Sequence, residues 1–133
     1  ANKFIVIACG GGGIPVIKND AGTLEGVSAV IDKDFAAEKL AELVSADYLF
    51  ILTAVDRVAV NFGKPEQKDL AEMTVEEAKK YCEEGHFAPG SMLPKVEAAM
   101  MFVESGSNRK AVICSLEKVQ LAVKGESGTL ITQ

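Results

Sequence analysis

Two lysines occupy helix starts, where an α-helix favours acidic residues. Lys33 lies between Asp32 and Asp34 at the start of one predicted helix, and Lys95 follows Pro94 at the start of another. The first turn of a helix exposes N–H groups and carries partial positive charge, so a lysine there costs roughly 0.3–1 kcal/mol. The same features bind anions. The two lysines predict a polyphosphate site suited to phosphoryl transfer, which needs positive charge rather than a covalent nucleophile. A solvated surface lysine is the alternative interpretation of each.

Four consecutive glycines follow a strand that we predict over residues 4–8. Backbone without Cβ atoms can approach a ligand closely, and consecutive N–H groups can surround an anion. The run is neither a Walker A loop nor the pattern G-x-G-x-x-G, because Pro15 stands where the last glycine of that pattern would be. We expect an anion or substrate site at Gly10, Gly11, Gly12 and Gly13, with a flexible turn as the alternative.

A hydroxyl and a carboxylate follow the strand predicted over residues 48–53, in the segment Thr53-Ala54-Val55-Asp56. Ligands of parallel sheets bind beyond the carboxyl ends of strands. These two groups suit contacts with a nucleotide or with the waters of a magnesium ion, and a strand cap with a turn is the alternative. The loop over residues 61–65 is expected to form one wall of an adenine pocket. Phe62 would lie either in that wall or in the hydrophobic core.

Strand and helix patterns alternate along the chain, which predicts an α/β fold with a mostly parallel sheet sandwiched by helices. Apolar runs predict strands over residues 4–8, 48–53, 58–60, 111–114 and 129–131. Helices are expected over residues 33–45, 94–104 and 116–123, and a further helix begins at the capping box Thr74–Glu77 and ends at Gly85. The first helix is expected to bury a stripe and to leave its charged residues in solvent. The stripe is Phe35, Ala36, Leu40, Leu43 and Val44, and the solvent side is Glu38, Lys39 and Glu42.

The composition is that of one globular domain and narrows the class of function. The 133 residues carry a net charge of −5, which disfavours nonspecific binding to nucleic acids or anionic membranes. No apolar run approaches the roughly 18–20 residues of a membrane helix, and no signal peptide is recognisable. The three cysteines, Cys9, Cys82 and Cys114, lack metal-ligand spacing, so we expect reduced thiols in a cytoplasmic protein, with Cys9 small and buried. His86 follows a helix-ending glycine, where a structural role is expected.

Five segments together resemble the carbamate kinases of the amino acid kinase family. Three of them are specific to that group: ACGGGGIPV over residues 8–16, VIDKDFA over residues 30–36 and EGHFAPGSMLPK over residues 84–95. The Thr-x-Val-Asp pattern of LTAVD, residues 52–56, is shared by the wider family, and NFGKP, residues 61–65, is the fifth segment. The resemblance extends over essentially the whole chain, in order and at matching spacing.

The resemblance implies reversible, magnesium-dependent phosphoryl transfer between ATP plus carbamate and ADP plus carbamoyl phosphate, used at the end of arginine breakdown. It implies that Lys33 and Lys95 neutralise the phosphoryl group during transfer and that Asp34 holds both lysines in place. The glycine run would lie near the carbamate or phosphoryl end, and the enzyme would be a homodimer. The implied nucleotide contacts are Thr53, Ala54, Val55, Asp56, Phe62, Gly63, Lys64 and Met92.

The sequence departs from the carbamate kinase pattern in two places. Carbamate kinases carry an amino-terminal half with its own glycine-rich loop and a further lysine at the phosphoryl site, and nothing here matches it. The expected organisation is a single nucleotide-binding domain over residues 1–133, without the carbamate-binding half. We expect this domain to bind nucleotide but to catalyse little or no phosphoryl transfer by itself. Arg57 stands where many relatives have glycine. The alternatives are another amino acid kinase, such as a uridylate or glutamate kinase, and a non-catalytic nucleotide-binding module.

Overall fold

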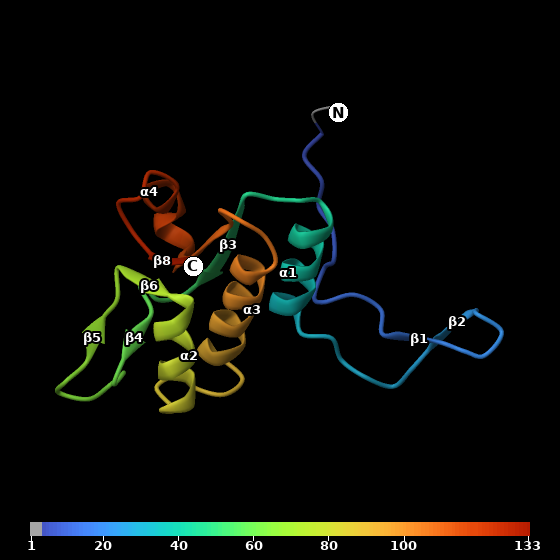
Figure 1. Cartoon of the computed structure of the whole chain (residues 1–133), viewed down its shortest axis with the longest axis horizontal. Coiled ribbons are helices and arrows are strands. Elements are labelled where there is room, and N and C mark those ends of the chain that lie inside the picture. The colour runs from blue at the N-terminus through green and yellow to red at the C-terminus, as the bar shows by residue number, and fades with distance from the viewer. Residues whose placement is uncertain (1–3) are drawn as a thin grey trace.

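A four-stranded sheet lies at the centre of the structure, a computed structural model that describes residues 4–133 (Figure 1). Its strands lie in the order β3 (Tyr48–Thr53), β7 (Lys110–Ser115), β8 (Thr129–Thr132) and β6 (Glu72–Thr74). The β3–β7 and β6–β8 pairs are parallel, and the β7–β8 pair is antiparallel. Since two of the three pairings are parallel and helices flank the sheet, the predicted α/β fold is confirmed.

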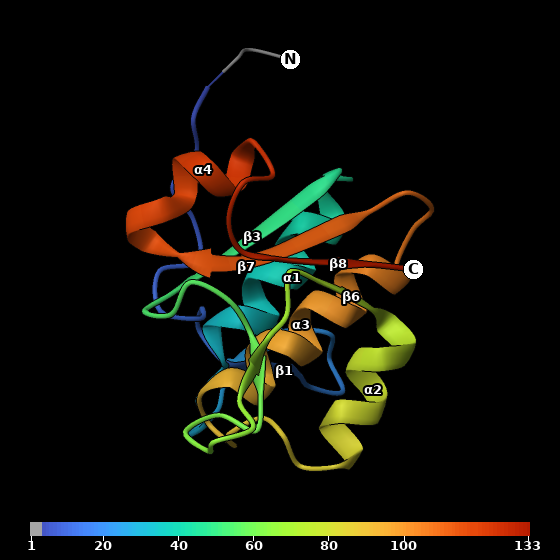
Figure 2. The same cartoon turned by 90° about the vertical axis from the view of Figure 1, so that its left-hand side faces the viewer.

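Three helices cover one face of the sheet and a fourth lies on the opposite face (Figure 2). The first three are α1 (Lys33–Leu43), α2 (Val75–Glu83) and α3 (Met92–Glu104), and the fourth is α4 (Val119–Val123), which follows the 3₁₀ turn η1 (Leu116–Lys118). Successive residues of a strand point to opposite faces, so Leu49 and Ile51 of β3 join the main core with Phe102 of α3. No helix within residues 4–133 is both long and apolar enough to cross a membrane.

The starts of α2 and α3 follow different rules. Thr74 and Glu77 form the predicted capping box, with the Glu77 N–H donating to Thr74 Oγ1 at 3.1 Å. Helix α3 begins two residues before the predicted position and has no side-chain hydrogen bond at Ser91, its first flanking residue. Pro94 fits in its first turn because a proline there gives up an N–H that has no partner within the helix.

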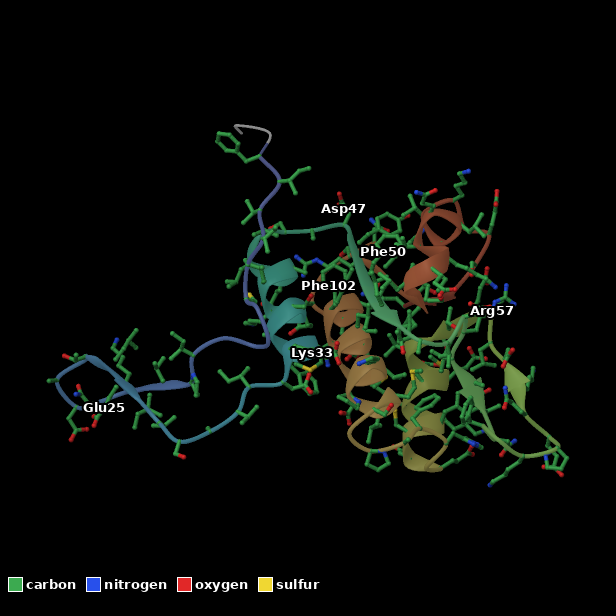
Figure 3. All side chains as sticks on the ribbon, turned by 180° about the vertical axis from the view of Figure 1, so that it is seen from behind. Glu25, Lys33, Asp47, Phe50, Arg57 and Phe102 are labelled. Atoms are coloured by element: carbon green, nitrogen blue, oxygen red, sulfur yellow. The ribbon has the colours of Figure 1, made fainter. Side chains whose placement is uncertain are left out.

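Two hairpins lie outside the central sheet. The first pairs β1 (Val16–Lys18) with β2 (Leu24–Gly26) and extends away from the core, as the position of Glu25 relative to Phe102 shows (Figure 3). The second pairs β4 (Ala59–Val60) with β5 (Lys68–Asp69) and leaves the sheet just after β3. This second hairpin is the one that contributes to the site described below.

The prediction of a buried strand over residues 4–8 is wrong for this structure. Phe4, Ile5, Val6 and Ile7 are 77–98% exposed, and the segment pairs with no strand among residues 4–133. An apolar run becomes a buried strand only when other strands pair with it and helices cover it. Cys9 was also expected to be buried, but it is exposed and lies in the left-handed region with φ 64°.

The predicted buried face of α1 is wrong for most of its residues, although Phe35 packs against the main core as expected. The helix buries Asp34, Glu38 and Ala41, whereas Leu43 and Val44 are exposed. The buried residues follow the spacing of one helix face, and an ion pair between Asp34 and Lys95 of α3 turns that face toward α3. Glu38, placed in solvent by the sequence pattern, is therefore only 2% exposed.

Gly12 brings the glycine run against the start of α1. Its φ is +145°, and a Cβ at this position would lie 2.0 Å from the carbonyl oxygen of Ile31. The Gly12 N–H donates to the Cys9 carbonyl at 2.9 Å, which closes a turn. Only a residue without a side chain permits this approach, so Gly12 holds the run beside the first turn of α1.

Replacing Gly12 with alanine is expected to release this contact. The clash and the unfavourable φ are worth on the order of 1–3 kcal/mol, so exchange of the residue-12 amide hydrogen should accelerate about tenfold or more. NMR-detected hydrogen exchange measures this amide exchange rate in the wild type and in the variant. Gly11→Ala is the matched control because no atom lies within 4 Å of a Cβ there. Equal effects of both substitutions would contradict the assigned role of Gly12.

Replacing Glu38 with glutamine is expected to stabilise the chain at neutral pH. Burial, with a smaller effect of Glu42, raises the pKa of Glu38 above its ordinary value. The folded state then holds the Glu38 proton more tightly than the unfolded state, a contribution to stability that is lost as pH rises through the folded-state pKa. Urea denaturation should show a larger gain from Glu38→Gln at pH 7 than at pH 4. The exposed Glu83→Gln is the control, and a destabilised Glu38→Gln variant at pH 7 would contradict the prediction.

Candidate active site

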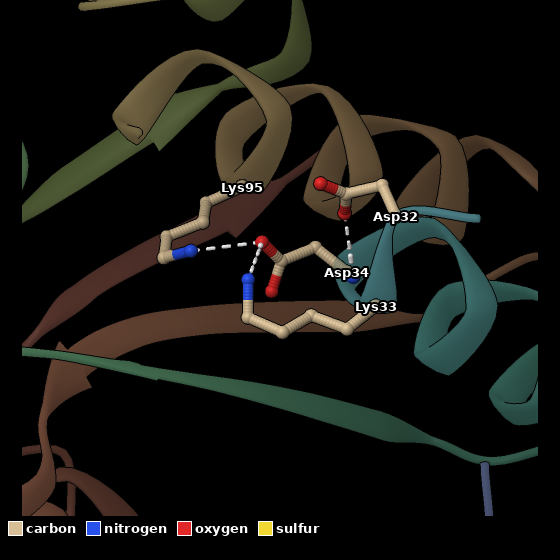
Figure 4. A network of polar contacts seen from close by, with 4 residues as sticks. All are labelled: Asp32, Lys33, Asp34 and Lys95. Carbon is tan, nitrogen blue, oxygen red and sulfur yellow. Dashed lines mark hydrogen bonds and ion pairs between the residues drawn. The ribbon is translucent and has the colours of Figure 1, made fainter. Parts of the chain in front are cut away.

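One carboxylate oxygen joins the two lysines that the sequence singled out. Asp34 Oδ2 accepts hydrogen bonds from Lys95 Nζ at 2.8 Å and from Lys33 Nζ at 3.3 Å (Figure 4). Asp34 is buried, the Lys95 side chain is 13% exposed, and the Lys33 side chain is 59% exposed. The two lysines and the aspartate together carry a net charge of +1, with Lys95 largely enclosed and Lys33 open to solvent.

The first turns of α1 and α3 hold this cluster. Asp32 Oδ1 accepts from the Asp34 N–H at 2.7 Å and thereby caps α1. The side chain of Ser91 makes no such bond at the start of α3. The Ser91 and Leu93 N–H groups donate to the Ala88 carbonyl at 3.2 Å and 3.1 Å, and Pro94 has no N–H. What the first turn of α3 adds next to Lys95 is therefore the partial positive charge of a helix start, which favours anions.

The shared carboxylate also keeps Lys33 charged. Its hydrogen bond with Asp34, and then the negative charge of Asp34, raise the pKa of Lys33 above the ordinary lysine value. A raised pKa means that the ammonium form persists at neutral pH and is lost only as pH rises through the folded-state value. The positive charge of Lys33 therefore persists across the physiological pH range.

A cavity of about 440 Å³ lies at the carboxyl end of β3, between the β4–β5 hairpin and the segment that leads into α3. Ser91 and Met92 line it, one helical turn before Lys95. Six of the eight predicted nucleotide contacts line this cavity: Thr53, Ala54, Val55, Phe62, Lys64 and Met92. The sequence motifs therefore converge on one hollow beside the lysine cluster.

Two of the predicted contacts do not line the cavity. Asp56 is paired with Lys118 of η1, and Gly63 lies in the hairpin loop without facing the hollow. The glycine run meets the cluster from another side, through the contact of Gly12 with Ile31 just before α1.

His86 lines the same cavity, although the sequence suggested only a structural role. Its Nδ1 accepts from the Asn61 N–H at 3.4 Å, and its Nε2 lies 3.2 Å from a carboxylate oxygen of Glu84. An accepting Nδ1 requires the neutral tautomer that donates through Nε2, which these two partners satisfy. Asn61, in the loop predicted to form a wall of the pocket, lines the cavity as well. Sequence reasoning missed Arg57, Ala59 and the stretch Phe87–Pro89 as cavity residues, because their contacts arise from the fold alone.

A second cavity, of about 520 Å³, lies on the face of the sheet that carries α4. It is lined by Phe50, Val112 and Leu130 with Lys110 and Lys124 near them. Lys33, Asp34 and Lys95 do not line this second cavity, which shares the lining residue Arg57 with the first. The chemistry suggested by the sequence therefore belongs to the smaller cavity.

Comparison with known proteins assigns the chain to a family. A sequence profile described as the amino acid kinase family matches residues 1–115. The curated carbamate kinase of Clostridium perfringens is 66% identical over 130 residues, which are 98% of this chain and 41% of that protein. Carbamate kinase 1 of Enterococcus faecium is 57% identical over 134 residues, covering 99% of this chain and 42% of that protein.

A solved structure agrees with this assignment. The carbamate kinase from Giardia lamblia bound to AMP-PNP matches with a TM-score of 0.87 at 41% identity, covering 92% of this chain and 42% of that one. The predicted resemblance to carbamate kinases is confirmed, and the chain spans about two-fifths of the length of the curated relatives it matches. Because the family profile covers most of the sequence, the chain belongs to the amino acid kinase family.

Proposed function

We propose that these residues form the nucleotide-binding part of a carbamate kinase, which transfers a phosphoryl group reversibly between ATP plus carbamate and ADP plus carbamoyl phosphate. The observation that carries the proposal is the single Asp34 oxygen shared by Lys33 and Lys95 beside the cavity at the end of β3. Similarity to carbamate kinases over nearly the whole chain supports it. Since the chain spans about two-fifths of those relatives, the complete activity is proposed for a protein of their full length.

The two lysines act on the charge of the group being transferred. In most analyses the phosphoryl group passes through a loose transition state, with negative charge on its oxygens. Lys95, partly buried and hydrogen-bonded to Asp34, presents a positioned donor, and the exposed Lys33 can follow the group as it moves. Asp34 is the positioning residue, because its carboxylate sets where both ammonium groups lie. Such fixed charges stabilise the transition state without any reorganisation at the moment of reaction.

The cavity accepts the nucleotide in this proposal. Phe62 and Met92 supply apolar surface for a base, and Lys64 supplies a positive charge. Thr53, Ala54 and Val55 bring the end of β3 to the same hollow. The glycine run would lie near the carbamate or phosphoryl end. Nucleotide contacts from Asp56 and Gly63 remain predictions from the motifs.

Magnesium enters this proposal together with the nucleotide. Within residues 4–133, no group of three or more His, Cys, Asp or Glu side chains is placed to hold a metal ion. Magnesium is commonly held by substrate phosphates, its own waters and one or two carboxylates, so the residues present fit an ion delivered as a nucleotide complex. When bound, the ion neutralises charge on the phosphates and orients them.

The remaining expectations concern the cellular setting and rest on the resemblance to carbamate kinases alone. We propose that residues 1–133 act as one nucleotide-binding domain of a homodimeric, cytoplasmic enzyme. The reaction would run toward ATP at the end of arginine breakdown, with carbamoyl phosphate as the phosphoryl donor.

Calorimetric titration of the chain with magnesium and ADP tests the nucleotide site. We expect binding by the wild type and an affinity about tenfold lower in Lys33→Ala, which loses a charge-assisted contact to phosphate. Lys39→Ala is the matched control, because Lys39 lies on the same helix and pairs with Glu42 away from the site. No heat from a demonstrably folded wild type would contradict a nucleotide site within these residues. Binding of UMP in preference to ADP would favour a uridylate kinase.

Turnover is tested in a chimera in which this chain replaces the matching segment of the Clostridium perfringens relative. We expect Lys95→Ala to lower kcat by about 10²–10³ while KM for ADP changes little, because the lysine acts on charge that develops in the transition state. Lys79→Ala, which removes an exposed lysine paired with Glu104, should leave both constants unchanged. A raised KM with unchanged kcat would assign Lys95 to ground-state binding instead.

A further inference from the structure

The hydroxyl of Thr129 lies inside the neck of the β4–β5 hairpin. Thr129 is the first residue of β8 and is completely buried. Its Oγ1 accepts from the Val58 N–H at 2.8 Å and donates to the Leu70 carbonyl at 2.6 Å. Residues 58 and 70 belong to the two arms of the hairpin, so one side chain from a different part of the sheet bonds to both arms.

The register of the hairpin shows what this hydroxyl replaces. Ala59 pairs with Asp69 and Val60 with Lys68, so the next pair toward the sheet is Val58 with Leu70. The Leu70 N–H donates to the Val58 carbonyl at 2.8 Å, as expected for a hydrogen-bonded antiparallel pair. The second bond of such a pair would join the Val58 N–H to the Leu70 carbonyl. Here both groups bond to Thr129 Oγ1 instead, which inserts the hydroxyl into the ladder.

Gly128 permits this insertion. A Cβ at Gly128 would lie 2.9 Å from Cys114 Cβ and 3.1 Å from the Ile113 carbonyl oxygen, and its φ is +90°. The absence of a side chain lets the start of β8 lie against β7 and places Thr129 at the hairpin. The pair Gly128–Thr129 thus joins the sheet to a hairpin that shares no regular strand pairing with it in residues 4–133.

The hairpin held in this way is one wall of the cavity beside the lysine cluster. Ala59, Asn61, Phe62 and Lys64 line that cavity and lie beyond the neck. Because Val58 immediately precedes Ala59, the separation of the arms at the neck determines where this wall stands relative to Thr53 and Met92. Thr129 itself is not among the residues that line the cavity.

We propose that Thr129 is a positioning residue for nucleotide binding: its hydroxyl, inserted between Val58 and Leu70, fixes the β4–β5 hairpin as the wall of the cavity. The link to nucleotide rests on the proposed function, whereas the insertion rests on geometry alone. Removing the hydroxyl leaves a buried donor and a buried acceptor without their partner. The two arms of the β4–β5 hairpin would then either pair directly with each other at Val58 and Leu70 or admit a water molecule between them. Either change would move the wall that the hairpin forms at the cavity.

The test uses the 133-residue chain and three variants of graded hydrogen-bonding ability. Thr129→Ser keeps the hydroxyl, Thr129→Cys replaces it with a weakly bonding thiol, and Thr129→Val removes it at nearly constant shape. We expect Val58 amide exchange, measured without nucleotide, to accelerate about tenfold or more in Thr129→Val, less in Thr129→Cys and little in Thr129→Ser. The dissociation constant for magnesium and ADP should rise in the same order, by about tenfold in Thr129→Val. If Thr129→Val does not fold, the same two measurements on Thr129→Cys and Thr129→Ser test the proposal, which requires faster Val58 exchange and weaker ADP binding in Thr129→Cys.

Ile131→Val separates positioning from stability. Ile131 lies in the same strand and is completely buried, but it makes no polar contact with the hairpin, so its truncation should leave both Val58 exchange and ADP affinity at wild-type values. Wild-type exchange at Val58 in Thr129→Val would overturn the insertion. Accelerated exchange with unchanged ADP affinity, or an equal loss of affinity in Ile131→Val, would overturn the positioning role. Absence of ADP binding by the wild type would count against the proposed function, while exchange at Val58 would still decide the insertion.

Discussion

Asp34 lies between two ammonium groups, and the arrangement of α1 against α3 follows from that contact. Like charges repel, so Lys33 and Lys95, which both bond to Asp34 Oδ2, would repel each other without a carboxylate between them. The contact requires Asp34 to point toward α3. Residues one and two turns further along the same face, Glu38 and Ala41, must then point inward too. The burial of Glu38 thus accompanies the ion pair between α1 and α3 and does not follow the hydrophobic pattern of the helix.

The site is formed at the ends of elements, and each end is fixed by a different device. The start of α1 is fixed by Asp32, by Asp34 and by the close approach of Gly12 to Ile31. The start of α3 carries Pro94 and no side-chain cap. The hairpin after β3 is held by a hydroxyl from β8 and by the ring of His86. Regular strands and helices supply the rigid frame, while these local contacts set the distances between the groups that would meet a nucleotide.

The sequence predicted well those features whose cause is local. The apolar run Tyr48–Thr53 is the central strand, and the Thr74–Glu77 capping box begins a helix, because strand burial and helix capping depend on neighbouring residues. The lysines at two helix starts could also be identified from charge alone. That one carboxylate joins them was expected only from the resemblance to carbamate kinases. Charge and spacing alone could not show it, since residues 34 and 95 meet only when α1 packs on α3.

Features that depend on a distant partner were missed or misread. Residues 4–8 have the composition of a buried strand but no strand to pair with in the described part of the chain. The apolar stripe of α1 was judged by hydrophobicity, which does not include the ion pair that turns the helix. Thr129 resembles any other strand threonine until the hairpin, 59 and 71 residues earlier in the chain, is placed around its hydroxyl. Such contacts join residues far apart in the sequence, and the residue types that make them are too common to identify the contacts in advance.

The exposed run Phe4–Ile7 bears on how this chain behaves in concentrated solution. Strand β3 ends the order of the central sheet, and Tyr48 and Leu52 are 51% and 40% exposed on it. An uncharged, β-branched segment and an unblocked sheet edge on the same chain are the elements from which intermolecular strand pairing and aggregation begin. These two features favour self-association of the chain as its concentration rises, so dilute samples are the ones expected to report the monomer.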